Sequence, residues 1–170
     1  MTVYIAFLRA VNVGGTGKLP MADLTTLCEA LGFAQVRTYI ASGNVVFAAP
    51  GTELEVKAAL EGALARYAGK PIGVLVRTGP ELEAVLAANP FPGAAGNRTV
   101  AIFLNSAPPA DALEQATGRN GELTALGQRE IYVHYGDGMA QTKLKIPSAK
   151  TGTARNMNTV AKLAQMAREA

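Results

Sequence analysis

The chain has 170 residues, of which 49% are hydrophobic and 17% are charged, and its formal net charge is +3. A chain of this length can bury one large core or two small ones. Its apolar runs are all shorter than the roughly 18 residues that a membrane-spanning helix needs. The single cysteine, Cys28, excludes an internal disulfide.

Residues 1–8 form the first apolar run. They are too few for the hydrophobic region of a secretory signal, and no cationic segment precedes them. Arg9 follows directly. We therefore expect these residues to form a strand, and the protein to be cytoplasmic with no membrane association.

The first half of the chain predicts six elements. The helix that ends at Gly32 carries an apolar stripe at i, i+3, i+4 and i+7 from Leu24. The Ser-Gly-Asn run at 42–44 is typical of a turn between two strands. In chain order the elements are a strand at 3–8, a helix at 21–32, strands at 36–41 and 45–49, a helix at 53–67 and a strand at 72–77. The βαββαβ order predicts a ferredoxin-like sandwich.

The second half repeats this mixture more loosely. We expect a helix at 80–88, a strand at 99–105, a helix at 109–117, strands at 123–126 and 131–135, a short helix at 139–145 and a last helix at 156–168. The fold class is therefore α+β, with a ferredoxin-like lobe at residues 1–79. A second, smaller α+β lobe at residues 80–170 ends in a basic helix.

Basic residues concentrate near the end of the chain. Residues 138–170 hold six lysines and arginines against one acidic residue, whereas residues 1–137 hold ten basic and twelve acidic residues. A local excess of positive charge favours anionic partners. It can equally complement the acidic remainder of the chain, and both interpretations stay open.

Topology predicts which polar segments are neighbours. Strands one and two run parallel in a ferredoxin-like sandwich, so the segments that follow them leave the sheet at the same end. The loop at 9–18 and the turn at 42–44 should then lie close together, although they are far apart in sequence.

Several kinds of catalytic chemistry find little support. His134 is the only histidine, and its alternation with Ile131 and Val133 places it on the opposite, half-exposed face of a strand. Cys28 lies in the apolar stripe of the first helix, which indicates a buried thiol and not a nucleophile. No histidine, cysteine or acidic spacing indicates a metal site, and we expect no cofactor.

The run Gly14-Gly15-Thr16-Gly17-Lys18 has the residue types of a phosphate loop. Glycines let backbone N–H groups face an anion, and a lysine adds charge. It is not a Walker A loop, because Asn12 stands where that motif has its first glycine, and Leu19 stands where it has Ser or Thr. A flexible strand-to-helix connection is the alternative.

Residues 151–159 open the last helix with several candidate caps. A helix N-terminus attracts anions through its free N–H groups and its dipole, and Arg155 adds a bidentate donor. Asn156, Asn158 and Thr159 add neutral donors. Capping alone explains one or two of these residues, but less easily all of them.

Three segments also resemble a known family. Residues 9–15, 38–47 and 153–163 read RAVNVGG, TYIASGNVVF and TARNMNTVAKL. In this order they are similar to the bacterial proteins called domain of unknown function 1697. The resemblance covers essentially the whole chain and implies two α+β subdomains, the first of them ferredoxin-like. It implies no established activity, cofactor or catalytic residue.

The chain departs from the pattern of that family at several positions. Ala10 replaces a frequent glycine, and Thr142 begins a pair that is often Ser-Lys. Met157 replaces a frequent tryptophan, which removes an aromatic residue that could stack on a ligand.

These polar segments make up the predicted ligand site. We expect loop 9–18, turn 42–44 and the helix start at 153–162 to contribute to one cleft. The residues are Arg9, Asn12, Gly14, Gly15, Lys18, Ser42, Asn44, Arg155, Asn156, Asn158 and Lys162.

Four functions compete at this point. Binding of a small molecule or phosphate-type anion accounts best for the polar residues. Nucleic-acid binding fits the basic end, but Val3–Leu8 is apolar on both faces, and aromatic residues for base stacking are only 6% of the chain. The third candidate is a phosphate-handling enzyme. The first lobe is similar to acylphosphatases in its expected fold and in its loop residue types, although the loop motif differs. A protein-interaction module would explain the missing catalytic groups. The oligomeric state stays open.

Overall fold

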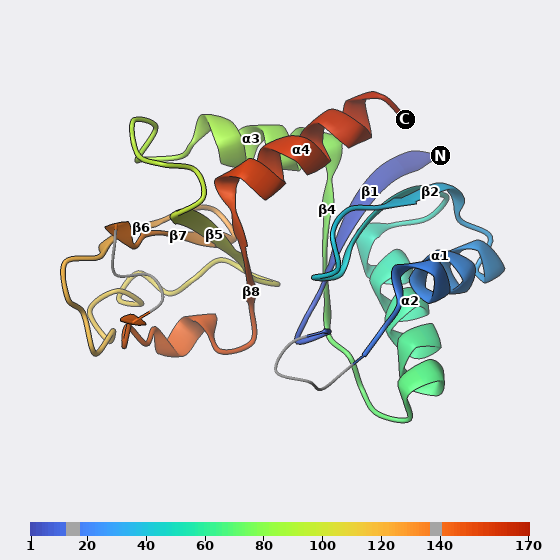
Figure 1. The fold of residues 1–170 in the computed structure, drawn as a ribbon, viewed down its shortest axis with the longest axis horizontal. Helices are drawn as coiled ribbons and strands as arrows, with labels where there is room; N and C mark the ends of the chain where they lie inside the picture. The colour runs from blue at the N-terminus through green and yellow to red at the C-terminus, as the bar shows by residue number, and fades with distance from the viewer. Residues whose placement is uncertain (13–17, 137–140) are drawn as a thin grey trace. The chain divides into compact units, whose positions relative to one another are not determined.

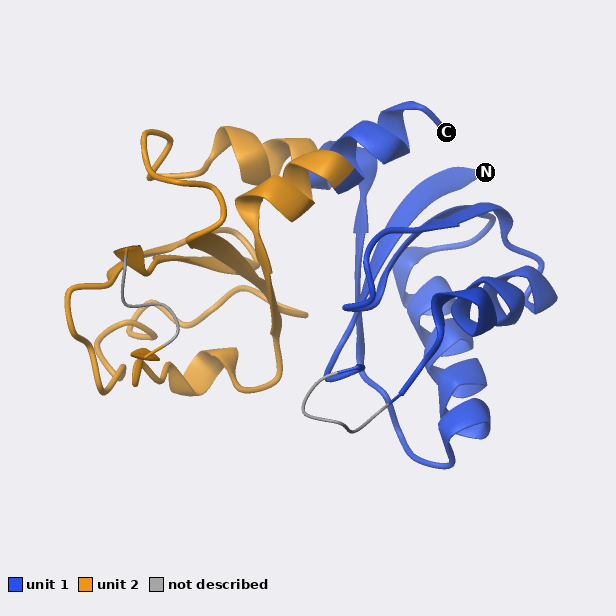
Figure 2. Ribbon diagram, in the orientation of Figure 1, with its two compact units in different colours: residues 1–82, 163–170 blue, residues 83–162 orange. Residues whose placement is uncertain are grey.

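The structure is a computed structural model that describes residues 1–12, 18–136 and 141–170. The chain folds into two compact units, shown in Figure 2. Unit 1 contains residues 1–82 and 163–170, and unit 2 contains residues 83–162. The two-lobe boundary after residue 79 stays a prediction. Among the described residues, no helix combines the length and apolar character needed to cross a membrane.

Unit 1 has the expected βαββαβ order (Figure 1). Its elements are β1 (Thr2–Leu8), α1 (Met21–Ala30), β2 (Ala34–Thr38), β3 (Asn44–Ala49), α2 (Glu53–Ala68) and β4 (Val74–Thr78). The sheet order is β2-β3-β1-β4, and every neighbouring pair is antiparallel. Strands β1 and β2 are therefore parallel to each other, and the ferredoxin-like arrangement is confirmed.

Local sequence sets the ends of α2. Thr52 and Glu55 form a reciprocal capping box at its N-terminus, with Thr52 Oγ1 accepting from the Glu55 backbone N–H at 3.2 Å. Gly69 ends the helix at φ +72°, a left-handed conformation that costs glycine little. Both signals are local, which is why this helix is easily placed from the sequence.

The core of unit 1 lies between α1, α2 and one face of the sheet. Alternate residues of β1 point into it, beginning with Tyr4 and ending with Leu8. Phe33 and Phe47 stack with their ring centroids 4.4 Å apart. Figure 1 shows both helices on the same side of this sheet.

The opposite face of the same sheet is buried as well. Ile5 pairs with Val46 on one side and with Arg77 on the other, and all three are at most 1% exposed. Arg37 completes this row at the β2 edge, and its guanidinium donates to the carbonyl of Met166, near the C-terminus. The expectation that β1 is covered on both faces is confirmed.

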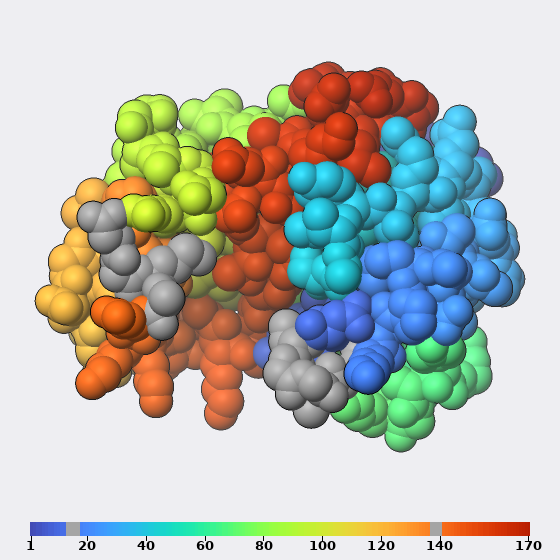
Figure 3. Space-filling model, in the orientation of Figure 1, coloured from blue at the N-terminus to red at the C-terminus, as the bar shows by residue number. Residues whose placement is uncertain are grey.

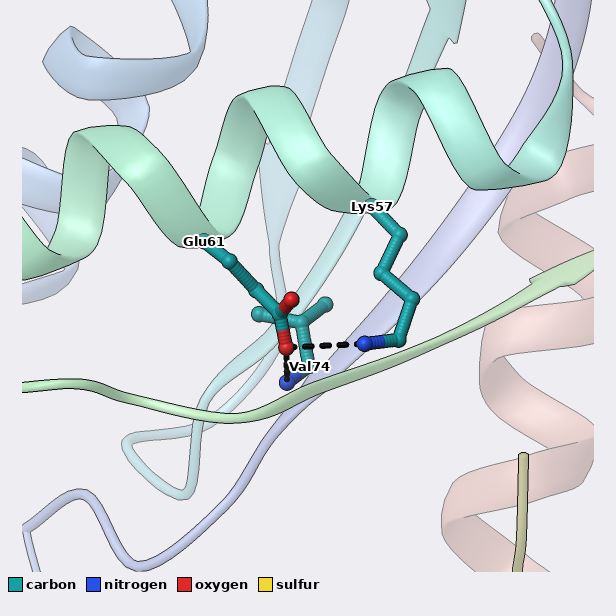
Figure 4. Close-up of polar contacts among 3 residues, drawn as sticks. All are labelled: Lys57, Glu61 and Val74. Atoms are coloured by element: carbon teal, nitrogen blue, oxygen red, sulfur yellow. Dashed lines mark hydrogen bonds and ion pairs between the residues drawn. The ribbon is translucent and has the colours of Figure 1, made fainter.

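One carboxylate fastens α2 to the start of β4. Glu61 Oε2 accepts from Lys57 Nζ at 2.9 Å and from the Val74 backbone N–H at 3.0 Å (Figure 4). The lysine contact is a partly exposed i,i+4 pair. The contact with Val74 joins residues that are 13 positions apart. It therefore ties α2 to β4, which the pair within the helix does not do.

Unit 2 contains a second antiparallel sheet, in the order β6-β7-β5-β8. The elements of the second half are α3 (Gly79–Ala87), β5 (Thr99–Phe103), β6 (Leu123–Leu126), β7 (Glu130–His134), η2 (Pro147–Ala149), β8 (Thr153–Asn156) and α4 (Met157–Arg168). Val100, Ile102, Ile131 and Val133 face a core that irregular segments complete. The α+β class is thus confirmed in both halves.

Two expectations for this half were wrong. Residues 110–115 form turns and not a helix, because their hydrogen bonds mostly close over three residues, as from Ala112 N to Pro109 O. Strand β8 was missed, because Thr153–Asn156 has no apolar alternation and is a strand only through its pairing with β5. The short helix expected at 139–145 lies partly outside the described residues.

Removal of the Glu61 carboxylate should destabilise the protein. We expect Glu61→Ala to lower the free energy of unfolding by about 1–3 kcal/mol, because the Val74 N–H loses its acceptor. Lys57→Gln removes only the half-exposed ion pair and should cost less than about 1 kcal/mol. Urea unfolding of both variants measures the difference. Equal losses would show that the contact with Val74 contributes nothing.

Candidate functional site

Asn12 joins the loop after β1 to the turn after β2. Its Nδ2 donates to the carbonyls of Leu19, at 2.9 Å, and of Ala41, at 2.6 Å. Its Oδ1 accepts from the Leu19 backbone N–H at 2.8 Å. Figure 3 shows the dark-blue residues after β1 against the cyan β2–β3 turn on one face of unit 1. The predicted proximity of these two segments is therefore observed.

The turn itself is held by Asn44. This residue is fully buried, and its Nδ2 donates to the Tyr39 carbonyl and to Ser42 Oγ, both at 3.0 Å. Gly43 has φ +90°, and a Cβ there would lie 2.6 Å from Val11 Cγ2. Only glycine fits this close approach of turn and loop. Asn12 and Asn44 thus position the backbone, and both Nδ2 and Oδ1 of Asn12 are already hydrogen-bonded.

Left-handed backbone is concentrated at this end of the sheet. Ala10, Asn12 and Ile40 have φ of 54°, 55° and 51°. Such conformations cost alanine or a β-branched residue about 1–3 kcal/mol each, and in proteins they cluster at binding and active sites. The strain marks this end of unit 1 as the place to look for a ligand.

Arg9 lies beside the start of β4. Its backbone N–H donates to the Gly73 carbonyl at 2.9 Å, and a Cβ on Gly73 would lie 3.1 Å from Arg9 Cδ. The arginine side chain therefore passes over a glycine that leaves room for it. Of the other predicted residues in this lobe, Gly14 and Gly15 lie outside the described residues.

Lys18 lines a hollow that the sequence alone did not reveal. This lysine hollow has a volume of about 400 Å³ and is lined by Lys18, Leu19, Tyr67, Ala68, Lys70 and Ile72. Tyr67 Oη donates to the Asp23 carboxylate at 2.5 Å, and this hydrogen bond raises the pKa of the phenol. No described residue that lines the hollow is acidic. The missed residues come from the end of α2, where the one local signal was a lysine in the Gly-Lys-Pro run at 69–71.

The N-terminus of α1 follows Lys18 and Leu19 in the chain. Its N-cap residue, Pro20, has no side chain that could accept a hydrogen bond, so no side chain caps the helix. Unpaired N–H groups and the helix dipole make such an end electropositive. Asp23 in the first turn offsets part of that charge and is engaged by Tyr67.

The second predicted set lies around the start of α4. Arg155 belongs to β8, is only 8% exposed and donates to Thr153 Oγ1 and the Ala154 carbonyl. Burial lowers the pKa of its guanidinium to about 10, so it stays charged at neutral pH. Asn156 Oδ1 accepts from the Thr159 N–H at 2.9 Å, which is an N-cap contact.

Two more residues of that set are exposed. Asn158 lies close to Gly96: a Cβ added to Gly96 would be 2.2 Å from Asn158 Oδ1. Lys162 lies on α4 with its side chain exposed. Strand pairing and capping account for where Arg155 and Asn156 lie. A ligand-binding role for this set, and a cleft shared with the first set, stay predictions.

His134 and Cys28 have the surroundings that the sequence indicates. His134 is half-buried, and its Nδ1 lies 2.9 Å from Thr99 Oγ1, on the face opposite Ile131 and Val133. Cys28 is fully buried, and burial raises the pKa of its thiol to about 12. In the described part of the chain, no three histidine, cysteine or acidic side chains are grouped as metal ligands would be.

The fold and this site define a class of two-unit α+β proteins with a ferredoxin-like first unit. A comparison with curated proteins finds no matching sequence. The structure is similar to that titled "conserved bacterial protein SP0830 from Streptococcus pneumoniae", with 25% sequence identity, a TM-score of 0.82 and 99% of each chain covered. Residues 1–132 match the family described as "Protein of unknown function (DUF1697)". The chain belongs to this family.

The hydrogen bonds of Asn12 should be separable from its backbone strain. We expect Asn12→Gly to lower the free energy of unfolding by about 1–2 kcal/mol, through lost hydrogen bonds and the greater freedom of the unfolded chain. Asn12→Ala should cost about 1 kcal/mol more, because alanine is strained at φ 55°. Urea unfolding measures both. Ala10→Gly, which relieves strain without touching a side-chain contact, should not destabilise. Equal stability of the glycine and alanine variants would show that the backbone at position 12 is not strained.

Cys28 should resist thiol reagents while the protein is folded. With a pKa of about 12, its thiolate is scarce, whereas an unfolded chain exposes a thiol with a pKa of about 8.5. We expect labelling by a chromogenic disulfide at about pH 8 to be at least a thousandfold slower in native buffer than in urea. Fast labelling of the native protein would contradict the burial, and Cys28→Ala gives the background rate.

Proposed function

We propose that this protein binds a small phosphate-type anion at the end of unit 1, in the lysine hollow. The observation that carries the proposal is that Lys18 and Lys70 line one hollow whose described walls contain no carboxylate. Among the described residues, neither lysine is in an ion pair. An anion placed between the two ammonium groups would gain charge-assisted hydrogen bonds from both.

The neighbouring backbone supports this assignment. The uncapped start of α1 follows Lys18 and Leu19, and helix N-termini favour anions. Arg9 lies against Gly73, the residue that follows Ile72 of the hollow. Gly14 and Gly15 precede Lys18 in the chain, and their predicted role is to turn backbone N–H groups toward the anion.

Nucleic-acid binding is less well supported by this unit. Recognition of single-stranded RNA on a ferredoxin-like sheet needs exposed aromatic residues on an open face. Here Ile5, Phe7 and Val46 are fully buried on the face away from α1 and α2. Binding of this kind therefore has no surface on the sheet.

A thermal-shift titration with inorganic phosphate, sulfate, a nucleoside triphosphate and short RNA tests the proposal. A bound ligand at about 100 times its Kd adds roughly 2.7 kcal/mol to stability. At about 2–4 °C per kcal/mol for a chain of this size, we expect Tm to rise by several degrees with at least one small anion. The double variant Lys18→Gln/Lys70→Gln should lose this shift.

The matched control is Lys145→Gln/Lys150→Gln. It removes the same charge from two exposed lysines that are outside the hollow and outside the predicted site, and it should keep the shift. No shift with any small anion, or the same loss in both double variants, would overturn the proposal. A shift with RNA alone, falling steeply with salt, would favour nucleic acid instead.

A further inference from the structure

Tyr67 lines two hollows of different character. One is the lysine hollow, and the other is an apolar groove of about 420 Å³ between α1 and α2. The apolar groove is lined by Leu27, Ala30, Leu31, Ala63, Arg66 and Tyr67. Because both share this tyrosine, the lysine hollow and the apolar groove are neighbours on unit 1.

The two hollows are complementary in chemistry. Leu27 and Leu31 expose part of their side chains to the apolar groove while they also pack against the core. Arg66 is the only charged residue of the groove among the described residues, and it is basic. Neither hollow has an acidic residue among its described lining residues, and the Asp23 carboxylate beside the shared Tyr67 is engaged by the hydroxyl of that tyrosine.

Tyr67 fits the junction between them. Its side chain is 43% exposed, and its hydroxyl is fixed on Asp23 in the first turn of α1. A tyrosine that is anchored in this way has an apolar ring available to line the groove, while its hydroxyl is held by Asp23. Each hollow is at the small end of the range for ligand pockets, whereas the two together have the size of an ordinary one.

We propose that the ligand is a single-chain amphiphile, with its anionic group between Lys18 and Lys70 and its hydrocarbon chain in the apolar groove beside Tyr67. This proposal rests on the proposed anion site and adds the class of ligand. The apolar groove is lined by residues 27–31 on the α1 side and 63–67 on the α2 side, about 6 Å along each helix, so it holds part of an extended hydrocarbon chain. The occupant is a free amphiphile and not a membrane surface, because the groove is a hollow of about 420 Å³, at the small end of ligand pockets.

Calorimetric titration of the whole protein with dodecyl phosphate, below its micelle concentration, tests this. We expect one molecule to bind, at least about a hundredfold more tightly than inorganic phosphate. Burial of about two methylene groups already corresponds to roughly tenfold in affinity. Dodecyl maltoside, which has the chain without the anion, should bind at least about tenfold more weakly than dodecyl phosphate.

Two sets of variants separate the head from the chain. Lys18→Gln/Lys70→Gln should weaken both phosphate and dodecyl phosphate by at least about tenfold. Ala30→Glu places a charge on an exposed helical position of the groove, and should weaken dodecyl phosphate by at least about tenfold without changing phosphate binding. Ala30→Gln should do the same more mildly. Ala84→Glu, on an exposed alanine of α3 that lines neither hollow, should change neither.

The outcomes distinguish this inference from the proposed function. Equal affinity for phosphate and dodecyl phosphate would overturn the chain site and leave the anion site standing. No binding of either would overturn both. Equal binding of dodecyl phosphate and dodecyl maltoside would mean apolar capture without head recognition, which also refutes the inference. Binding only to phosphatidylcholine vesicles that contain dodecyl phosphate would point to a membrane surface instead.

Discussion

The structure depends most on the burial of β1 on both faces. This strand pairs with β3 and β4 at the centre of the first sheet, and Ile5, Ala6 and Phe7 are completely inaccessible to solvent. Burying apolar area on two faces supplies much of the driving force of the unit. It also forbids polar chemistry along the strand, since an unpaired buried polar group is costly. The proposed anion site accordingly lies beyond the end of this strand and not along it.

At that point the polar residues divide into two kinds. The side-chain amides of Asn12 and Asn44 donate hydrogen bonds to backbone carbonyls of the loop and the turn. These contacts hold strained backbone conformations in place. Lys18 and Lys70 line a hollow and supply charge. In the proposed function, Asn12 fixes the backbone of Leu19 beside Lys18, and a pre-formed wall of this kind reduces the entropy lost when a ligand binds.

The second unit shows how tertiary context reassigns a motif. The TARNMN run reads as the beginning of a helix, and Asn156 does cap α4. Pairing with β5, however, makes its first four residues the edge strand β8 and buries Arg155. The strand is held by its pairing with β5, and Arg155 donates to Thr153 within the same strand. Residues 110–115 were likewise reassigned, from helix to turns that still pack Leu113 against the core.

The sequence by itself determined the order of elements in unit 1 and the proximity of Asn12 to the turn at Ala41. Hydrophobic periodicity, the Thr52 capping box and the turn residues are local signals, and ferredoxin-like topology then dictates which loops meet. Only the tertiary structure decided that Lys70 and Tyr67, from the far end of α2, share a hollow with Lys18. It also decided that Thr153–Asn156 is a strand. Both depend on contacts between residues distant in sequence, which no local pattern encodes.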